Sequence, residues 1–194
     1  MRDADNIRAV EALGVDWMGF IFYPPSKRYV DQLPAYLPNA SKRVGVFVNE
    51  SLETILEKIE LFQLDIVQLH GDESPAFCSH LAQHRIQIMK AFGIAESFPS
   101  KKIAEYEGSC DYFLFDTQTP TYGGSGRKFN WDILQNYQGS THFLLSGGID
   151  PDDAQAIQEF SHPLCIGVDI NSQFELLPAY KDIQSIEQFL KSLK

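Results

Sequence analysis

The sequence predicts an α/β fold, a (βα)8 TIM-barrel, and three observations predict it. Short β-branched and aromatic runs recur along the chain, and amphipathic helical patterns separate most of them. These runs are almost continuously apolar, which is typical of parallel strands that are buried on both faces and joined by helical crossovers. Repeated units of this kind form an open doubly wound sheet or a closed barrel, and their number favours the barrel.

The first predicted element is a helix at the N-terminus. Asp3 is a residue type that caps helices, Ile7, Val10 and Leu13 follow at helical spacing, and Gly14 ends the pattern. Because every later clear helix follows a strand, we expect one further strand directly before Asp3.

Seven strands and four clear helices are predicted in the rest of the chain. The strands are residues 17–22, 43–48, 65–69, 87–92, 111–115, 142–145 and 164–168, and the helices are residues 52–59, 77–82, 154–160 and 183–190. Residues 31–38 and 97–106 carry weaker patterns and are predicted as short or irregular helices. Seven strands leave two unpaired edges, so we expect the chain to lack the first β-strand of its barrel.

Composition predicts the broad class of protein. No composition break divides the 194 residues, which predicts a single barrel domain over residues 1–194 that starts at its first helix. The apolar runs fall well short of the roughly 20 residues that a membrane span needs, and the polar N-terminus is unlike a signal peptide. We therefore expect a cytoplasmic protein without a membrane partner.

Charge and cysteine content exclude further classes. With a net charge of −10 the chain has no basic stripe for nucleic acid, although backbone amides and one or two cations can still hold a small phosphate ester. Cys78, Cys110 and Cys165 are 32 and 55 residues apart, which is neither a disulfide framework nor a zinc-ligand pattern. We expect reduced thiols and no metal site.

Polar residues at the carboxyl ends of the predicted strands are the candidates for a functional site, because barrels build their sites there. Arg28 follows two prolines in the loop after the first of these strands. It either forms a bidentate pair with a carboxylate or is a solvated loop charge. His70 shares the strand parity of Gln68 and precedes Gly71. It either orients a substrate and carries a proton or binds a loop carbonyl.

Two more candidates come from strands in the middle of the chain. Lys90 lies in an apolar strand, where it either forms a Schiff base with a carbonyl substrate or is neutralised by a neighbouring carboxylate. Asp116 ends a strand of aromatic and aliphatic residues. These surroundings favour the protonated form that a general acid needs, although Asp116 can also cap a turn. The loop that contains Gly123, Gly124 and Gly126 is flexible enough to close over a ligand.

The last two predicted strands end in a pattern suited to phosphate. Gly147 and Gly148 let a phosphate approach the backbone, and amides at the start of a helix after Asp169 would complete the nest. The loops after strands seven and eight are the habitual phosphate site of this fold. Asp169 itself can accept hydrogen bonds from a sugar hydroxyl or cap the following segment.

The chain contains, in order, MRDADNI, GFIFYPPSKRYV, VGVFVN, VQLHGDE, the Asp116 stretch with YGGSG and FNW, LSGGI and GVDI. These seven motifs span essentially the whole chain, and together they resemble the phosphoribosylanthranilate isomerase family of tryptophan biosynthesis. The resemblance implies a barrel of the ribulose-phosphate-binding type and a small phosphorylated substrate. It also implies that no cofactor or metal is needed. A monomer or a homodimer is expected.

The activity that this resemblance implies is an Amadori rearrangement, the third step of tryptophan biosynthesis from chorismate. N-(5-phosphoribosyl)anthranilate would become 1-(2-carboxyphenylamino)-1-deoxyribulose 5-phosphate. Asp116 matches the general acid of the family, and Arg28 matches the residue that faces the anthranilate carboxylate. Further matches are the substrate-binding His70 and Asp169 and the phosphate-binding Gly147, Gly148 and Ser172.

The chain departs from the family in two places. After GVD it has Asn171, Gln173 and Phe174 instead of small residues and a glycine, which alters the expected phosphate geometry. The family's general base is a cysteine in a Lys-hydrophobic-Cys-Gly strand directly before the residues that here are Met1 to Asp3, and this chain lacks that motif. We therefore expect Met1 to be an internal methionine of a longer protein, with a genuinely shortened gene as the alternative.

The expected consequence is weak ligand binding and little or no turnover by the chain as it stands. Loss of a positioned general base typically costs about 10²–10⁴-fold in rate. The open edges of the sheet are also expected to favour association with another chain. Two other functions stay open, a Schiff-base lyase or aldolase that uses Lys90 and a non-catalytic phosphate-ester binder.

Overall fold

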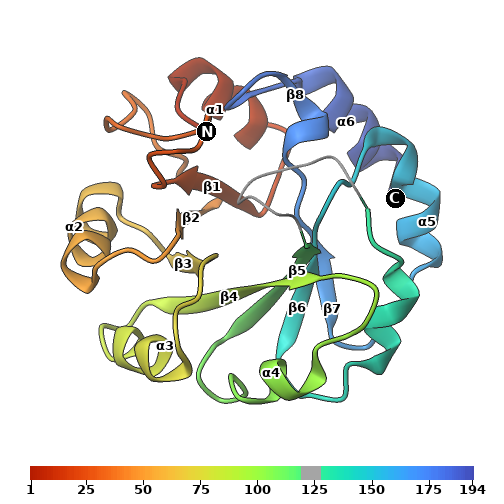
Figure 1. Cartoon of the computed structure of the whole chain (residues 1–194). Helices are drawn as coiled ribbons and strands as arrows, with labels where there is room; N and C mark the ends of the chain where they lie inside the picture. The colour runs from red at the N-terminus through yellow and green to blue at the C-terminus, as the bar shows by residue number, and fades with distance from the viewer. Residues whose placement is uncertain (119–127) are drawn as a thin grey trace.

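The computed structural model describes residues 1–118 and 128–194. Its main feature is a sheet of seven parallel strands whose order in space is their order in the chain. The strands are β1 (Trp17–Ile21), β2 (Lys42–Phe47), β3 (Ile66–Leu69), β4 (Gln87–Ile94), β5 (Tyr112–Thr117), β6 (His142–Leu145) and β7 (Cys165–Val168). Figure 1 shows the strands curving around a central space. The seven predicted strands are confirmed, with ends that differ by at most two residues.

The helices lie outside the curled sheet (Figure 1). They are α1 (Ala4–Glu11), α2 (Leu52–Phe62), α3 (Pro75–Ala82), α4 (Ser100–Ala104), α5 (Ala154–Glu159) and α6 (Ile183–Ser192). The described residues also contain three 3₁₀ turns, η1 (Trp131–Asn136), η2 (Pro151–Asp153) and η3 (Ser172–Phe174). None of the helices in the described residues is both long enough and apolar enough to cross a membrane.

The N-terminal helix forms where its sequence predicts it. The carboxylate of Asp3 accepts the backbone N–H of Asn6 at 2.8 Å, and Ile7 and Val10 are buried. The helix ends earlier than predicted, at Glu11. Gly14 takes a φ of +80° between the helix and β1, a conformation that glycine adopts without steric cost.

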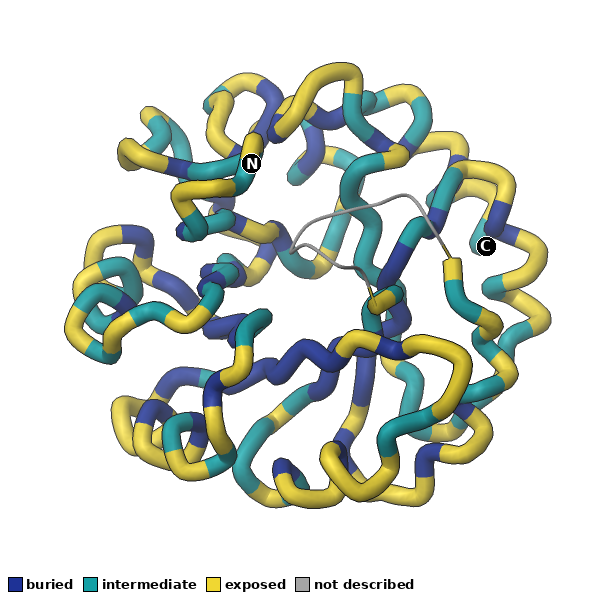
Figure 2. The backbone as a smooth tube through the Cα atoms, viewed as in Figure 1, coloured by how far each residue is buried: buried dark blue, intermediate teal, exposed yellow. Residues whose placement is uncertain are grey.

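Side chains on the two faces of the sheet form two separate apolar clusters. The outer cluster lies between sheet and helices and includes fully buried aromatic residues such as Phe47, Phe113 and Phe115. The inner cluster is small and consists of Val44, Ile66, Met89, Ala91, Leu114 and Leu144. Figure 2 shows the buried residues gathered along the strands. Because side chains alternate along a strand, this division decides which residues face the interior.

The two weaker helix predictions have different outcomes. Residues 31–38 form no helix, because two prolines lack the N–H that a helix interior needs. Glu11 instead holds the end of this segment by accepting the N–H of Asn39 at 2.6 Å. Within residues 97–106, a short helix does form, and it is the five-residue α4.

A hairpin that the sequence analysis did not predict follows η3. Its antiparallel strands are β8 (Glu175–Leu177) and β9 (Tyr180–Lys181), and Figure 1 shows it between α1 and α6. The side chain of Asn6 exchanges two hydrogen bonds, of 2.9 and 2.7 Å, with the backbone of Lys181. The hairpin is thereby fastened to the first helix.

The two outermost strands of the sheet, β1 and β7, do not pair with each other in the described residues. Beside β1, Tyr29 forms an isolated bridge with Ile21, and the amino group of Met1 donates to the Gly19 carbonyl at 2.6 Å. The fold is therefore an α/β half-barrel built from seven parallel strands. The further barrel strand that the sequence analysis expects before Asp3 stays a prediction.

Candidate active site

A cavity of about 680 Å³ occupies the interior of the curled sheet. Residues of the strands line it, together with the loops that follow the strands and parts of α1, α6 and the segment before β1. It brings together most of the predicted site residues, namely Arg28, His70, Asp116, Gly147, Gly148, Asp169 and Ser172. These residues come from five different loops or strand ends, so the fold alone makes them neighbours.

Asp116 and His70 face each other in this cavity. Oδ2 of Asp116, at the end of β5, is 3.4 Å from Nε2 of His70, which follows β3. Nδ1 of His70 is 3.0 Å from Oε1 of Gln68, and because that oxygen accepts only, it selects the tautomer with its hydrogen on Nδ1. Nε2 is then free to accept a hydrogen bond, and it faces the carboxyl group of Asp116 at the cavity surface.

Asp169 provides a second carboxyl group, directly after β7. Its Oδ2 accepts a hydrogen bond from Oγ of Ser146 at 2.9 Å. Burial raises the pKa of Asp169 and the charge of Asp116 adds to this, whereas the hydrogen bond from Ser146 opposes it. Asp169 therefore keeps its proton to a higher pH than an exposed aspartate does.

The geometry around Asp116 requires a glycine at position 147. The φ of Gly147 is +92°, and a Cβ atom there would lie 2.5 Å from N of Thr117 and 2.9 Å from Oδ1 of Asp116. The same Thr117 N–H donates to Oδ1 of Asp116 at 2.7 Å. Gly147 therefore lets the loop after β6 pass against the end of β5, a role that the sequence analysis did not foresee.

The loop after β7 differs from its prediction. No α-helix begins directly after Asp169, and the chain there forms the three-residue 3₁₀ turn η3, whose first residue, Ser172, lines the cavity. Phe174 is fully buried and the chain enters β8 at the next residue, so the helical turn cannot continue. A 3₁₀ turn therefore stands where the sequence analysis expected a helix, and phosphate binding at this place stays a prediction.

Arg28 is held by a carboxylate from the unpredicted hairpin. Nε of Arg28 donates to both oxygens of Glu175, at 3.0 and 2.8 Å, and Nη2 lies 2.6 Å from Oε2. Nζ of Lys181 is 3.2 Å from Oε1 of the same carboxylate and donates to the carbonyl of Asn171 at 3.0 Å. Arg28 is thus a largely buried, paired residue and not a solvated loop charge. Sequence analysis missed Glu175 because 147 residues separate it from Arg28.

Lys90 points away from the cavity, which contradicts its role as a Schiff-base lysine. Its side chain is 2% exposed and pairs with Glu73 at 3.2 Å. Its Nζ also donates to the carbonyls of Leu69, Gly71 and Ala91 at 3.0, 2.7 and 3.1 Å. Burial lowers the pKa of Lys90 and Glu73 opposes this shift. The alternative prediction, a lysine neutralised by a neighbouring carboxylate, is confirmed.

Comparison with known proteins decides the family. The family described as N-(5'phosphoribosyl)anthranilate (PRA) isomerase matches residues 1–192. The chain belongs to the phosphoribosylanthranilate isomerase family. It is 50% identical to the N-(5'-phosphoribosyl)anthranilate isomerase of Phocaeicola vulgatus over 194 residues, which cover 100% of this chain and 95% of that protein.

Solved structures of phosphoribosylanthranilate isomerases share this fold. The crystal structure of the enzyme from Thermotoga maritima matches with a TM-score of 0.80 and 33% identity, covering 100% of this chain and 95% of that one. A second isomerase was solved in complex with reduced 1-(o-carboxyphenylamino)-1-deoxyribulose 5-phosphate. It matches with a TM-score of 0.77 and 30% identity, covering 100% of this chain and 98% of that one.

The cysteines of this phosphoribosylanthranilate isomerase chain lie away from the cavity. All three cysteines lie in the described residues, and none of them lines the cavity. Cys78 is in α3, Cys110 lies two residues before β5, and Cys165 begins β7. The glycine loop at residues 123–126 lies outside the described residues, so its closure over a ligand stays a prediction.

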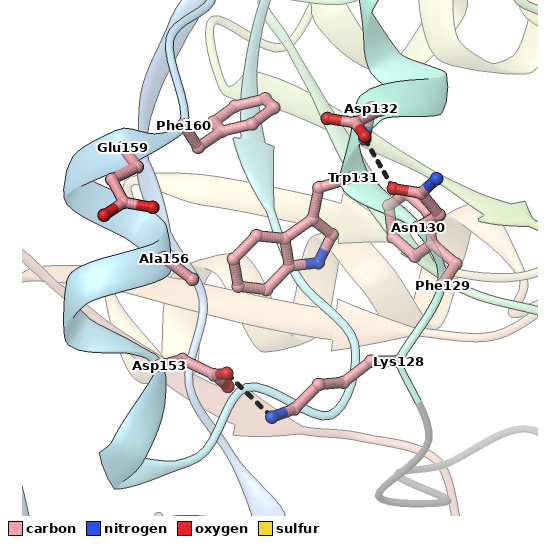
Figure 3. A pocket seen from close by; sticks show the side chains of 9 residues that line it. All are labelled: Lys128, Phe129, Asn130, Trp131, Asp132, Asp153, Ala156, Glu159 and Phe160. Carbon is pink, nitrogen blue, oxygen red and sulfur yellow. Dashed lines mark hydrogen bonds and ion pairs between the residues drawn. The ribbon is translucent and has the colours of Figure 1, made fainter.

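A second cavity, of about 390 Å³, lies apart from the isomerase site between η1 and α5 (Figure 3). Lys128 forms ion pairs of 2.7 Å with Asp150 and Asp153 beside it. The indole N–H of Trp131 has no hydrogen-bond partner within the part of the chain that is described. This cavity contains none of the predicted site residues.

Proposed function

We propose that this chain carries the substrate site of an enzyme that rearranges N-(5-phosphoribosyl)anthranilate to 1-(2-carboxyphenylamino)-1-deoxyribulose 5-phosphate. One observation carries the proposal. A single cavity is lined by the residues that the family resemblance assigns to proton donation, carboxylate binding and phosphate binding. A reduced form of the same product is the molecule bound in one of the solved relatives.

In the proposed mechanism Asp116 is the general acid. It gives its proton to the ring oxygen of the sugar, the C1–O bond breaks, and the nitrogen of the anthranilate forms a Schiff base with C1. A general base then removes the proton from C2, and the electron pair moves to give an enolamine. Protonation at C1 and loss of the hydroxyl proton at C2 yield the ketone. His70, 3.4 Å from Asp116, is suited to hold the acid in position and to share its proton.

The two charged ends of the substrate are proposed to bind to different loops around the cavity. Arg28 faces the carboxylate of the anthranilate, since a guanidinium and a carboxylate form bidentate hydrogen bonds. Backbone groups of Gly147 and Gly148, together with Ser172, receive the phosphate. Asp169 binds a sugar hydroxyl, and its raised pKa allows it to donate as well as accept a hydrogen bond.

We further propose that one more parallel strand, separate from the hairpin strand β8, pairs with β1 and β7 and completes the barrel. In the described residues the outer edges of β1 and β7 pair with no further strand of the sheet, which supports this proposal, because a closed barrel leaves no strand edge unpaired. The strand would carry the Lys-hydrophobic-Cys-Gly motif, and its thiol would be the general base. The chain without it is proposed to turn over slowly or not at all. Oligomeric state and cytoplasmic location stay predictions from the sequence.

A fluorescence assay of two preparations tests the proposed function. The 194-residue chain and the same chain extended by the proposed strand are each mixed with the phosphoribosyl-anthranilate adduct, whose fluorescence decays on turnover. We expect rapid decay with the extended chain and a rate about 10²–10⁴-fold lower without the thiol. The matched control replaces the cysteine of the added strand by serine, which restores the sheet but not the base.

Each outcome of this assay has a definite meaning. Rapid turnover by the unextended chain would show that another residue takes the C2 proton. Binding of the reduced product by the extended chain without turnover would contradict the isomerase and support a non-catalytic phosphate-ester binder. A Schiff-base lyase has no support, because the ammonium group of Lys90 is buried and fully hydrogen-bonded outside the cavity.

A further inference from the structure

We propose that Glu175 is a positioning residue, which fixes the guanidinium of Arg28 for recognition of a substrate carboxylate. The proposal rests on the proposed function, in which Arg28 faces the carboxylate of an anthranilate. It makes the hairpin β8–β9 part of the apparatus that distinguishes carboxylate-bearing substrates from those that lack a carboxylate.

Glu175 binds one edge of the guanidinium of Arg28. Its two oxygens accept from Nε at 3.0 and 2.8 Å, and Oε2 lies 2.6 Å from Nη2. The side chains of Glu175 and Arg28 are 4% and 16% exposed, so water has little access to the pair. A bidentate pair between charged partners fixes the plane of the guanidinium as well as its position.

The other edge of the guanidinium of Arg28 is available to a ligand. A guanidinium has five N–H donors in one plane, and Glu175 engages the Nε hydrogen and one on Nη2. Nη1 makes no hydrogen bond with any of the residues that the structure describes. The hydrogens of Nη1 and the second hydrogen of Nη2 form a fork that matches one more carboxylate. Arg28 lines the cavity, so a bound ring can present its carboxylate there.

Glu175 is itself held firmly enough to act as an anchor. Oε1 also accepts the backbone N–H of Ala179 at 3.1 Å and lies 3.2 Å from Nζ of Lys181. Burial opposes its ionisation, but the hydrogen bond from Arg28 and the charge of Lys181 hold the pKa of Glu175 below its usual value. Because two cations share this one carboxylate, a ligand carboxylate can bind Arg28 without displacing Glu175.

The test compares two ligands that differ in one carboxylate. The first is reduced 1-(o-carboxyphenylamino)-1-deoxyribulose 5-phosphate, and the second is its phenylamino counterpart without the carboxyl group. Calorimetry gives the Kd of each ligand for the unmodified chain and for Glu175→Gln. This substitution keeps the size of the side chain but replaces one carboxylate oxygen with an amide N–H donor, which faces the donors that Glu175 binds. The control is Glu187→Gln, an acid of similar type whose partner, Lys191, lies on the surface of α6.

We expect the unmodified chain and the control to prefer the carboxylate ligand by about 10- to 100-fold, the range for a charge-assisted hydrogen bond. In Glu175→Gln this preference should fall to a few-fold at most, while the Kd of the phenylamino ligand changes little. In an Arg28→Lys background the second substitution should have no further effect on the preference, because Glu175 acts through the guanidinium.

The outcomes separate this inference from the proposed function. An unmodified chain that prefers the carboxylate ligand, with Glu175→Gln preferring it equally, overturns the inference and leaves the function standing. Equal binding of both ligands by the unmodified chain contradicts the proposed role of Arg28 and the inference with it. If Glu175→Gln does not fold, the Nε–H resonance of Arg28 in the unmodified chain decides. We expect it to be unchanged by the carboxylate ligand, and a large shift would show that the ligand displaces Glu175.

Discussion

Replacing Gly147 with alanine should destabilise the protein by about 2–5 kcal/mol, because two costs add. A side chain at a φ of +92° is strained by roughly 1–2 kcal/mol. The new Cβ atom would also lie 2.5 Å from N of Thr117, a backbone atom that cannot rotate away. Overpacking of this kind typically costs about 1–3 kcal/mol. The displaced Thr117 N–H is the group that holds Oδ1 of Asp116, so the general acid should also move.

Gly108 offers a matched control. Its φ is +77°, and an added Cβ atom would meet no atom within 4 Å. Gly108→Ala therefore carries the strain of the backbone without the steric contact, and it should lose only about 1–2 kcal/mol. The difference between the two variants isolates the contact with Thr117.

Urea unfolding followed by circular dichroism measures both losses by linear extrapolation. The fluorescence assay of the strand-extended chain measures the effect on turnover, which should fall strongly in Gly147→Ala and stay unchanged in Gly108→Ala. Equal losses of stability in the two variants, to within about 0.5 kcal/mol, would refute the steric argument. A destabilised Gly147→Ala with normal turnover would refute the link to Asp116.

Three further predictions concern ionisable groups. Asp116→Asn in the strand-extended chain should lower turnover by about 10²–10⁴-fold with little change in the Kd of the reduced product, and an unchanged rate would remove Asp116 from the mechanism. Lys90→Met should cost about 3–5 kcal/mol in urea unfolding, because it leaves the buried carboxylate of Glu73 unpaired. Glu73→Gln should restore part of that loss, and simple addition of the two losses would contradict the pairing. Because burial raises the pKa of Asp169, its contribution to stability is present in acid and is lost as the pH rises through the folded-state pKa, above the ordinary value of about 4. The stability advantage of the unmodified chain over Asp169→Asn should therefore decline with rising pH over that range, and a constant difference would show that Asp169 is not perturbed.

Local sequence patterns predict the strands and much of the candidate site. A strand alternates its faces, so Gln68 and His70 had to share one face of β3 and its extension. A polar residue that ends an apolar strand, as Asp116 does, falls at the carboxyl end of the sheet, where the cavity lies. These features depend on neighbours in sequence and on the period of the strand, which the chain shows directly.

The remaining features depend on register and on contacts between distant segments. Met89 faces the interior, so its neighbour Lys90 faces the helices, but a sequence does not show which of the two faces is the inner one. Glu175 and Lys181 were missed because their hairpin strands are three and two residues long, too short for a periodic pattern. The partner of Arg28 becomes visible only when the two ends of the chain are brought together.

The separation of the two apolar clusters has a consequence for how this enzyme can evolve. The aromatic residues outside the sheet hold strands to helices, and removing one of them typically costs about 3–5 kcal/mol. Met89, Leu114 and Leu144, on the inner face, border space that is already open. Shortening one of these side chains enlarges the existing cavity and encloses no new void. A lineage can therefore change the size of ring that its enzyme accepts while the layer that keeps the protein folded stays as it is.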